Sequence, residues 1–124
     1  MFEIKNDKSI HITRGDIAVI SVSASNGESE HTFVAGDIVR INVHEKKNPK
    51  NVVLQKDVEV QSETKSVDIS LTREDTKIGN LISKPVEYWY EIELNPDTMP
   101  QTIIGYYEDG EKVFMLYPEG GEAE

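Results

Sequence analysis

The stretch Val86-Glu87-Tyr88-Trp89-Tyr90-Glu91-Ile92-Glu93-Leu94 decides the fold class, because its residues alternate along its whole length. Side chains of a β-strand point to opposite faces at every step, so the alternation predicts a strand with one apolar face. The other face carries three glutamates and the only tryptophan of the chain. We therefore expect this segment to build a sheet, since it contains no catalytic constellation.

Strand patterns continue on both sides of this segment. Downstream, residues 101–108 and 111–117 flank Asp109-Gly110, a dipeptide typical of a tight hairpin. Upstream, apolar and β-branched runs recur about every ten residues, at 2–5, 9–13, 16–24, 38–44, 51–60 and 67–71. This spacing is typical of sandwiches and barrels. The sequence predicts an all-β, immunoglobulin-like antiparallel β-sandwich of about seven to nine strands.

Local signals add one short helix and several turns. Thr72 is a good N-cap, acidic residues fill the next turn, and Gly79 suits a left-handed helix end. Asn26-Gly27 is a strong turn dipeptide. Gly15-Asp16 and Gly36-Asp37 both precede strand runs, which indicates the same type of turn at both positions. Arg14-Gly15-Asp16 also spells the integrin-ligand tripeptide, but the turn is the simpler explanation.

The alternation also predicts the core. The run 17–20 has no clean alternation, so the sequence does not decide its register. The expected core residues are Ile17 or its neighbours, Val39, Ile41, Val43, Val58, Val67, Ile69, Leu71, Tyr88, Tyr90, Ile92, Phe114 and Leu116.

Length and composition limit the class of protein. A chain of 124 residues has room for one domain with a real core, which we place at 1–117. Residues 118–124 are acidic and Gly-rich and are expected to form a disordered tail. Because cysteine is absent, disulfides and thiolate chemistry are excluded. No signal peptide or membrane helix is expected, and the absence of cysteine fits a chain that is made in a reducing cytosol.

Charge is strongly uneven along the chain. Residues 1–82 carry 11 basic and 13 acidic side chains, whereas residues 83–124 carry 2 basic and 10 acidic ones. The acidic part would repel phosphate backbones, which argues against nucleic acid as a partner. It would suit a partner with a basic surface, although solubility alone also accounts for such charge.

No residue pattern predicts catalysis, a cofactor or a metal. The three histidines stand on different segments without metal-ligand spacing, and no nucleophile elbow or phosphate loop occurs. Glu87, Glu91 and Glu93 share one strand face, where a glycosidase pair or a calcium site is conceivable. A solvated sheet face is the simpler interpretation, and we expect no enzyme.

The aromatic residues are the better candidates for binding. Trp89 points away from the apolar face, so it is either covered in the fold or offered to a partner. Tyr106 and Tyr107 fall on opposite faces of the next strand, and one of them should join Trp89. The expected partner-binding residues are Trp89, Glu87, Glu91, Glu93 and Tyr106.

Three segments carry a resemblance to a known family. The runs 67–79 (VDISLTREDTKIG), 85–94 (PVEYWYEIEL) and 109–120 (DGEKVFMLYPEG) resemble phage and prophage tail proteins of Gram-positive bacteria. They are most similar to the N-terminal domain of upper baseplate proteins, in which a strand, a short Thr-x-Glu-Asp helix, a Tyr-rich strand and a closing hairpin follow one another.

The resemblance implies a structural module of the host-attachment apparatus in a virion tail. It also implies contacts with other baseplate proteins and a homo-oligomer. The resemblance carries over no catalytic residue. The alternative is a β-sandwich that binds a carbohydrate or cell-surface glycan through exposed aromatic side chains.

Overall fold

The computed structural model describes residues 2–4, 8–26, 29–46, 48, 50–79, 82–105 and 112–119. Within these ranges it is mostly β, with one short helix, as the sequence predicts. The elements are β1 (Phe2–Ile4), β2 (Ile10–Thr13), β3 (Ala18–Val22), β4 (Ser25–Asn26), β5 (Ser29–Glu30), β6 (Ile38–Glu45), β7 (Val52–Glu59), β8 (Val67–Leu71), α1 (Arg73–Thr76), β9 (Val86–Leu94), β10 (Gln101–Ile104) and β11 (Lys112–Tyr117).

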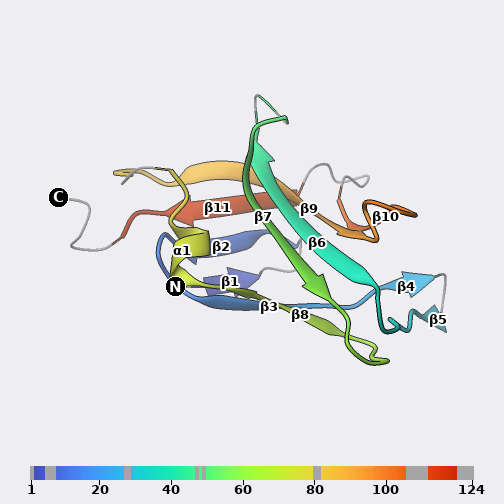
Figure 1. Cartoon of the computed structure of the whole chain (residues 1–124). Helices are drawn as coiled ribbons and strands as arrows, with labels where there is room; N and C mark the ends of the chain where they lie inside the picture. The colour runs from blue at the N-terminus through green and yellow to red at the C-terminus, as the bar shows by residue number, and fades with distance from the viewer. Residues whose placement is uncertain are drawn as a thin grey trace.

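A seven-stranded sheet dominates the molecule (Figure 1). Its strands follow the order β1-β2-β11-β9-β6-β7, and β10 pairs with β9 beside this path. The described ladders are antiparallel with one exception, since β2 and β11 run parallel with Phe114 opposite Ile10. The antiparallel expectation therefore fails at this pairing alone among the described ladders.

Strands β3 and β8 form a separate two-stranded sheet. Both alternate strictly between buried and exposed residues, so each presents one face to the core. The register of β3 is now decided, because Ala18, Ile20 and Val22 are buried whereas Ile17 is 70% exposed. The inward residues are thus the neighbours of Ile17.

The core lies on one face of the large sheet. Val39, Ile41, Val43, Ile92, Phe114 and Leu116 are fully buried there. Val67, Ile69, Leu71 and Tyr90 are also buried as expected, while Val58 and Tyr88 are only partly buried. The sequence-based list missed the buried residues Ile10, Ile12, Phe33, Leu54, Val60, Ile78 and Leu94.

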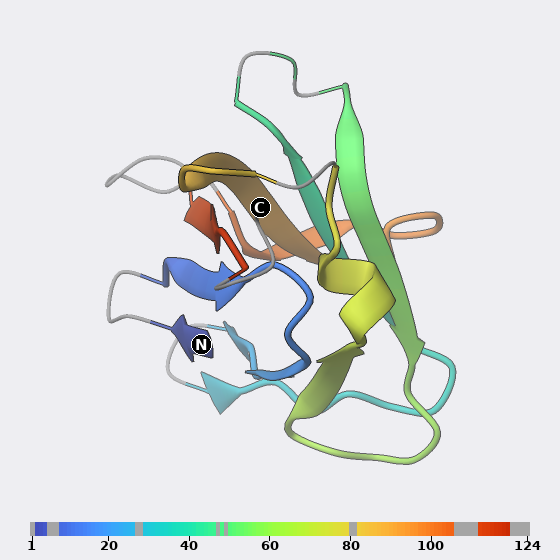
Figure 2. The same cartoon turned by 90° about the vertical axis from the view of Figure 1, so that its left-hand side faces the viewer.

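An ion pair connects the short helix α1 to strand β7 of the large sheet. Thr72 and Asp75 form a reciprocal capping box, which confirms the predicted N-cap. Lys56 lies on the inward face of β7, opposite Ile41, and its Nζ donates to Asp75 Oδ2 at 2.8 Å. Figure 2 shows α1 beside β7, in agreement with this bridge.

Two turns share one geometry, as the sequence predicts. Gly15 and Gly36 have positive φ angles of 86° and 97°. In each case the following Asp N–H donates to the carbonyl three residues back, from Asp16 to Thr13 and from Asp37 to Val34. These are type II turns, in which glycine is favoured at the third position. The expected turns at Asn26-Gly27 and Asp109-Gly110 involve residues outside the described ranges.

Arg14 joins three segments of the chain. Its buried guanidinium donates to the carbonyls of Ile78 and Gly79 and pairs with Glu119. The Arg-Gly-Asp tripeptide is therefore committed to internal contacts. Pro118 and Glu119 of the expected tail are half-buried, and residues 120–124 lie outside the described ranges.

None of the described helices is long and apolar enough to cross a membrane.

Candidate functional site

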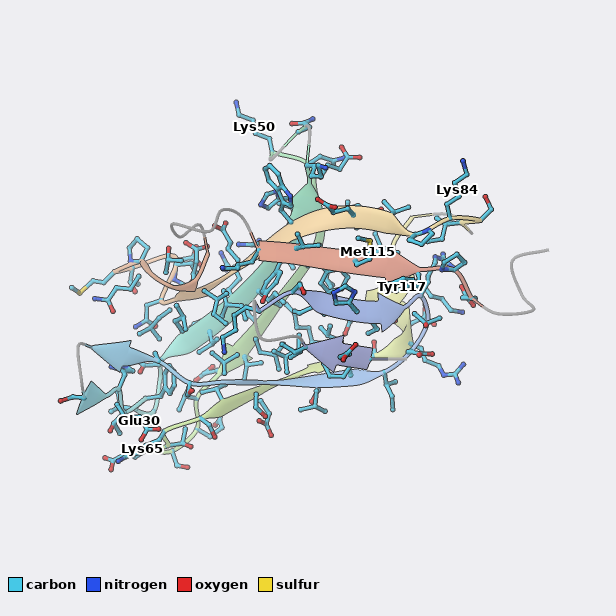
Figure 3. The ribbon with its side chains drawn as sticks, turned by 180° about the vertical axis from the view of Figure 1, so that it is seen from behind. Glu30, Lys50, Lys65, Lys84, Met115 and Tyr117 are labelled. Carbon is cyan, nitrogen blue, oxygen red and sulfur yellow. The ribbon has the colours of Figure 1, made fainter. Side chains whose placement is uncertain are left out.

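The two faces of the seven-stranded sheet differ in what lies against them. The inner face packs on the core, and we call the opposite one the outer face. Figure 3 views the molecule from behind, where β11 and β2 lie toward the viewer with Met115 and Tyr117 on display. No other described strand or helix lies over these strands in that view.

The outer face carries a band of half-buried aromatic and apolar side chains, which we call the Trp89 strip. Strand register brings its members together, because Trp89 lies opposite Val113 on one side and His44 on the other. Met115 lies opposite both Glu87 and His11, and Tyr117 is the next residue of β11 that faces outward. The Trp89 strip comprises His11, His44, Trp89, Val113, Met115 and Tyr117.

Trp89 is half-buried, with the edge of its ring set against His44. The two ring centroids are 6.4 Å apart and the planes meet at 87°. Such an edge-to-face contact orients the indole relative to the imidazole. The sequence left open whether Trp89 is covered, and in the structure its side chain is half-buried between its sheet neighbours Val113 and His44.

His11 anchors the other end of the strip. Ser9 Oγ lies 3.0 Å from His11 Nε2, and Tyr117 Oη lies 2.9 Å from His11 Nδ1. A serine, an imidazole and a third group in line resemble an activated nucleophile. Ser9 is only 7% exposed, however, so its hydroxyl is not presented to a substrate. The hydrogen bonds instead fix the ring of Tyr117.

A polar network occupies the far end of the outer face. Arg40 donates to both oxygens of Asp57 at 2.7 and 2.9 Å and also to Asp97. These hydrogen bonds raise the pKa of the Arg40 guanidinium, and the bond from Arg40 lowers the pKa of Asp57. Next to it, the Asn42 amide donates to Glu93 and accepts from Gln55. At this end of the face the Arg40 guanidinium is thus held by two aspartates of the same chain.

The three predicted glutamates lie on the outer face, but their surroundings differ. Glu87 pairs with Lys46 at 3.2 Å. Glu93 accepts from Asn42 at 3.2 Å, and its pKa is raised, first by burial and then by the charge of Glu91. Neither Glu91 nor Glu93 belongs to the lining of the cleft along residues 58–67 or of the cleft between residues 45–46 and 85–88.

The structure brings together Trp89, Glu87, Glu91 and Glu93, while Tyr106 lies outside the described residues. Sequence reasoning missed the rest of the strip. Its signal was present, because the alternation that buries Phe114 and Leu116 must turn Val113, Met115 and Tyr117 outward. The pairing of His44 with Trp89 could not be read from either strand alone.

Within the described residues, no cluster of three or more potential ligands could hold a metal.

Comparison of the chain with protein-family models, curated proteins and solved structures finds no match.

Proposed function

We propose that this chain is a non-enzymatic interaction module that docks a partner protein on the outer face of its large sheet. In this proposal the two layers form an immunoglobulin-like sandwich, and the module belongs to a phage or prophage tail baseplate. The observation that carries the proposal is the Trp89 strip. Aromatic residues that are half-exposed at the centre of a polar rim are the usual anchors of protein interfaces.

The strand edges support docking on the face rather than edge pairing. Strand β1 has only three residues, and β10 has four with an irregular register. The long edge strand β7 points the charged Lys56 inward, opposite the buried Ile41. Short strands, irregular registers and inward charges are devices that prevent strand addition. The open sheet face is thus the better contact surface.

Charge favours a basic partner. Among the described residues of the outer face the carboxylates outnumber the cations, and the cations Arg40 and Lys46 are already paired. The carboxylates on this face are Glu3, Asp57, Glu59, Glu87, Glu91, Glu93 and Asp97. Such a surface attracts a basic protein and repels a second copy of itself. Any homo-oligomer in the assembly would then use another surface.

The test is co-purification with the products of neighbouring genes. If the proposal holds, those genes encode tail proteins and one product binds the chain. Trp89→Ala should weaken that complex by about 2 kcal/mol or more, as expected for a hot-spot residue. Glu63→Gln, an exposed acid on a distant loop, is the matched control and should bind as the parent chain does.

Two outcomes would contradict parts of the proposal. If no tail gene lies nearby, the baseplate context is wrong. If Trp89→Ala binds its partner as tightly as the parent chain, the outer face is not the docking surface.

A glycan remains the second candidate, because Trp89 and Tyr117 present half-exposed rings on one face. A glycan array distinguishes the two functions. Binding to a cell-wall sugar that Trp89→Ala abolishes would favour the glycan, whereas no signal on any sugar would remove it.

A further inference from the structure

A cleft of about 500 Å³ opens beside the Trp89 strip, where β6 ends and β9 begins. It is lined by Glu45, Lys46, Pro85, Val86, Glu87 and Tyr88. We propose that this cleft receives an arginine side chain of the partner protein. The inference rests on the proposed function, which it extends by naming what the partner must present.

Strand register places carboxylates on two sides of the cleft. Glu45 lies opposite Tyr88 on the inward-pointing side of the sheet end, next to the pair of Val43 and Tyr90. Glu87 follows on the outer side, where it is held by Lys46. The lining therefore draws on both sides of the sheet end, and Glu87 belongs to the outer face on which the partner docks.

The two carboxylates differ in whether they are already neutralised. Lys46 Nζ lies 3.2 Å from Glu87 Oε2, so this charge has a partner. The Glu45 carboxylate is half-buried, and among the described residues its side chain makes no hydrogen bond or ion pair. A half-buried carboxylate without a cation among the described residues is free to accept charge-assisted hydrogen bonds from a cationic ligand.

Tyr88 supplies the second recognition element. A phenol is neutral at physiological pH, and burial and then the charge of Glu45 raise the pKa of Tyr88 further, against a smaller opposing effect of Arg14. A neutral aromatic ring beside a carboxylate is suited to a guanidinium, which can stack on the ring and donate two hydrogen bonds to the acid. Pro85 and Val86 offer apolar walls to the aliphatic stem.

The charge of the cleft also argues against other ligands. An anion would meet Glu45 and Glu87, and the one cation among the described lining residues, Lys46, is engaged by Glu87. The volume lies within the range of small-ligand sites, which is roughly 300–1,000 Å³. A side chain, unlike a long polymer, fits this size. The outer face around it is acidic as well, which would steer a basic partner toward the cleft.

Titration of the isotope-labelled chain with Nα-acetyl-arginine amide, followed by NMR, tests the proposal. We expect shifts centred on Glu45, Val86 and Tyr88, and weaker binding as salt is raised. Nα-acetyl-citrulline amide is the matched control ligand, because it keeps the shape of arginine without its charge. Equal binding of both ligands, or no binding of arginine, would overturn the inference.

Two variants localise the effect. Glu45→Gln should weaken arginine binding about tenfold, since a neutral hydrogen bond replaces a charge-assisted one. Glu63→Gln should leave it unchanged. If Glu45→Gln and Glu63→Gln behave alike, the arginine site lies elsewhere and the inference is wrong. A third titration with N-acetylglucosamine that shifts the same residues, without any effect of arginine, would assign the cleft to a sugar instead.

The inference and the proposed function fail separately. Trp89→Ala should leave binding of the arginine probe intact while it weakens the partner complex. If the partner docks normally on Glu45→Gln, the outer face is the interface and the cleft is not used.

Discussion

The inner and outer faces of one sheet are built from alternate residues of the same strands, yet they serve different ends. Phe114 is fully buried against the core, whereas its neighbour Met115 is half-buried on the open face. The same contrast separates Tyr90 from Trp89 on β9. Burial on the inner face stabilises the fold, whereas the large side chains of the outer face stay partly exposed to solvent.

This difference predicts which substitutions should lower the stability of the fold and which should weaken the binding of a partner. A residue in contact with the core loses both transfer free energy and packing when truncated. A residue on an open sheet face loses only its contacts with strand neighbours, which are typically worth below about 1 kcal/mol. Variants on the two faces should therefore divide cleanly into those that unfold the chain and those that weaken binding.

The largest contrast is expected between two consecutive residues of β11. Phe114→Ala should lower the free energy of unfolding by about 3–5 kcal/mol, because it leaves a cavity in the core. Met115→Ala should lower it by less than about 1 kcal/mol. Urea unfolding of both variants measures this, and equal losses would show that the outer face is packed like a core.

The buried Arg14 comes next. Arg14→Met should cost about 3 kcal/mol, because Glu119 and two carbonyls lose their buried donor. Glu119→Gln should cost about 1 kcal/mol, since an amide oxygen can still accept from Arg14. Thermal unfolding separates the two, and an unchanged midpoint for Arg14→Met would show that this arginine does not join the three segments.

The bridge from β7 to α1 should make stability fall in acid. Burial acts to raise the pKa of Asp75, but hydrogen bonds from Lys56 and Thr72 outweigh it and lower the pKa below its usual value. A lowered carboxyl pKa adds stability above the unfolded value, near pH 3.9, and that stability is lost as the pH falls through the folded value. Asp75→Asn should thus be less stable than the parent at pH 7 and nearly equal near pH 2.

Denaturation midpoints across this range would measure the effect. A difference between Asp75→Asn and the parent chain that stayed constant with pH would contradict it.

The smallest effect is expected on the outer face, with the opposite sign. The raised pKa of Glu93 means that its ionised form is less favourable in the folded state, so stability is lost as pH rises from about 4.3 through the folded value. Glu93→Gln keeps an acceptor for Asn42 and removes this charge. It should be as stable as the parent chain at pH 7 or slightly more stable, within about 0.5 kcal/mol. A clear loss of stability would show that Glu93 serves the fold.

Alternation predicted most strands and the inward residues of β6, β8, β9 and β11, because these strands have one buried and one open face. It left β3 undecided, since Ile17, Val19 and Ile20 are equally apolar and only packing selects the last of these for the core. It also gave no sign of the parallel pairing of β2 with β11. That contact joins the two ends of the chain.

The candidate site was predicted in part for the same reason. The outward direction of Trp89 follows from the sequence of β9 alone, and the structure agrees. The neighbours that make it a strip come from β6, β11 and β2, and they depend on strand order and register. That Glu45 has no ion-pair partner among the described residues depends on three-dimensional contacts, which no local pattern encodes.

The most direct test of the open, acidic outer face uses Trp89 itself, the only tryptophan of the chain. Quenching of its fluorescence by acrylamide, caesium and iodide reports both its exposure and the charge around it. We predict that acrylamide quenches it readily, and that caesium quenches better than iodide because carboxylates surround the ring. A tryptophan shielded from acrylamide, as in a protein core, would contradict the central claim.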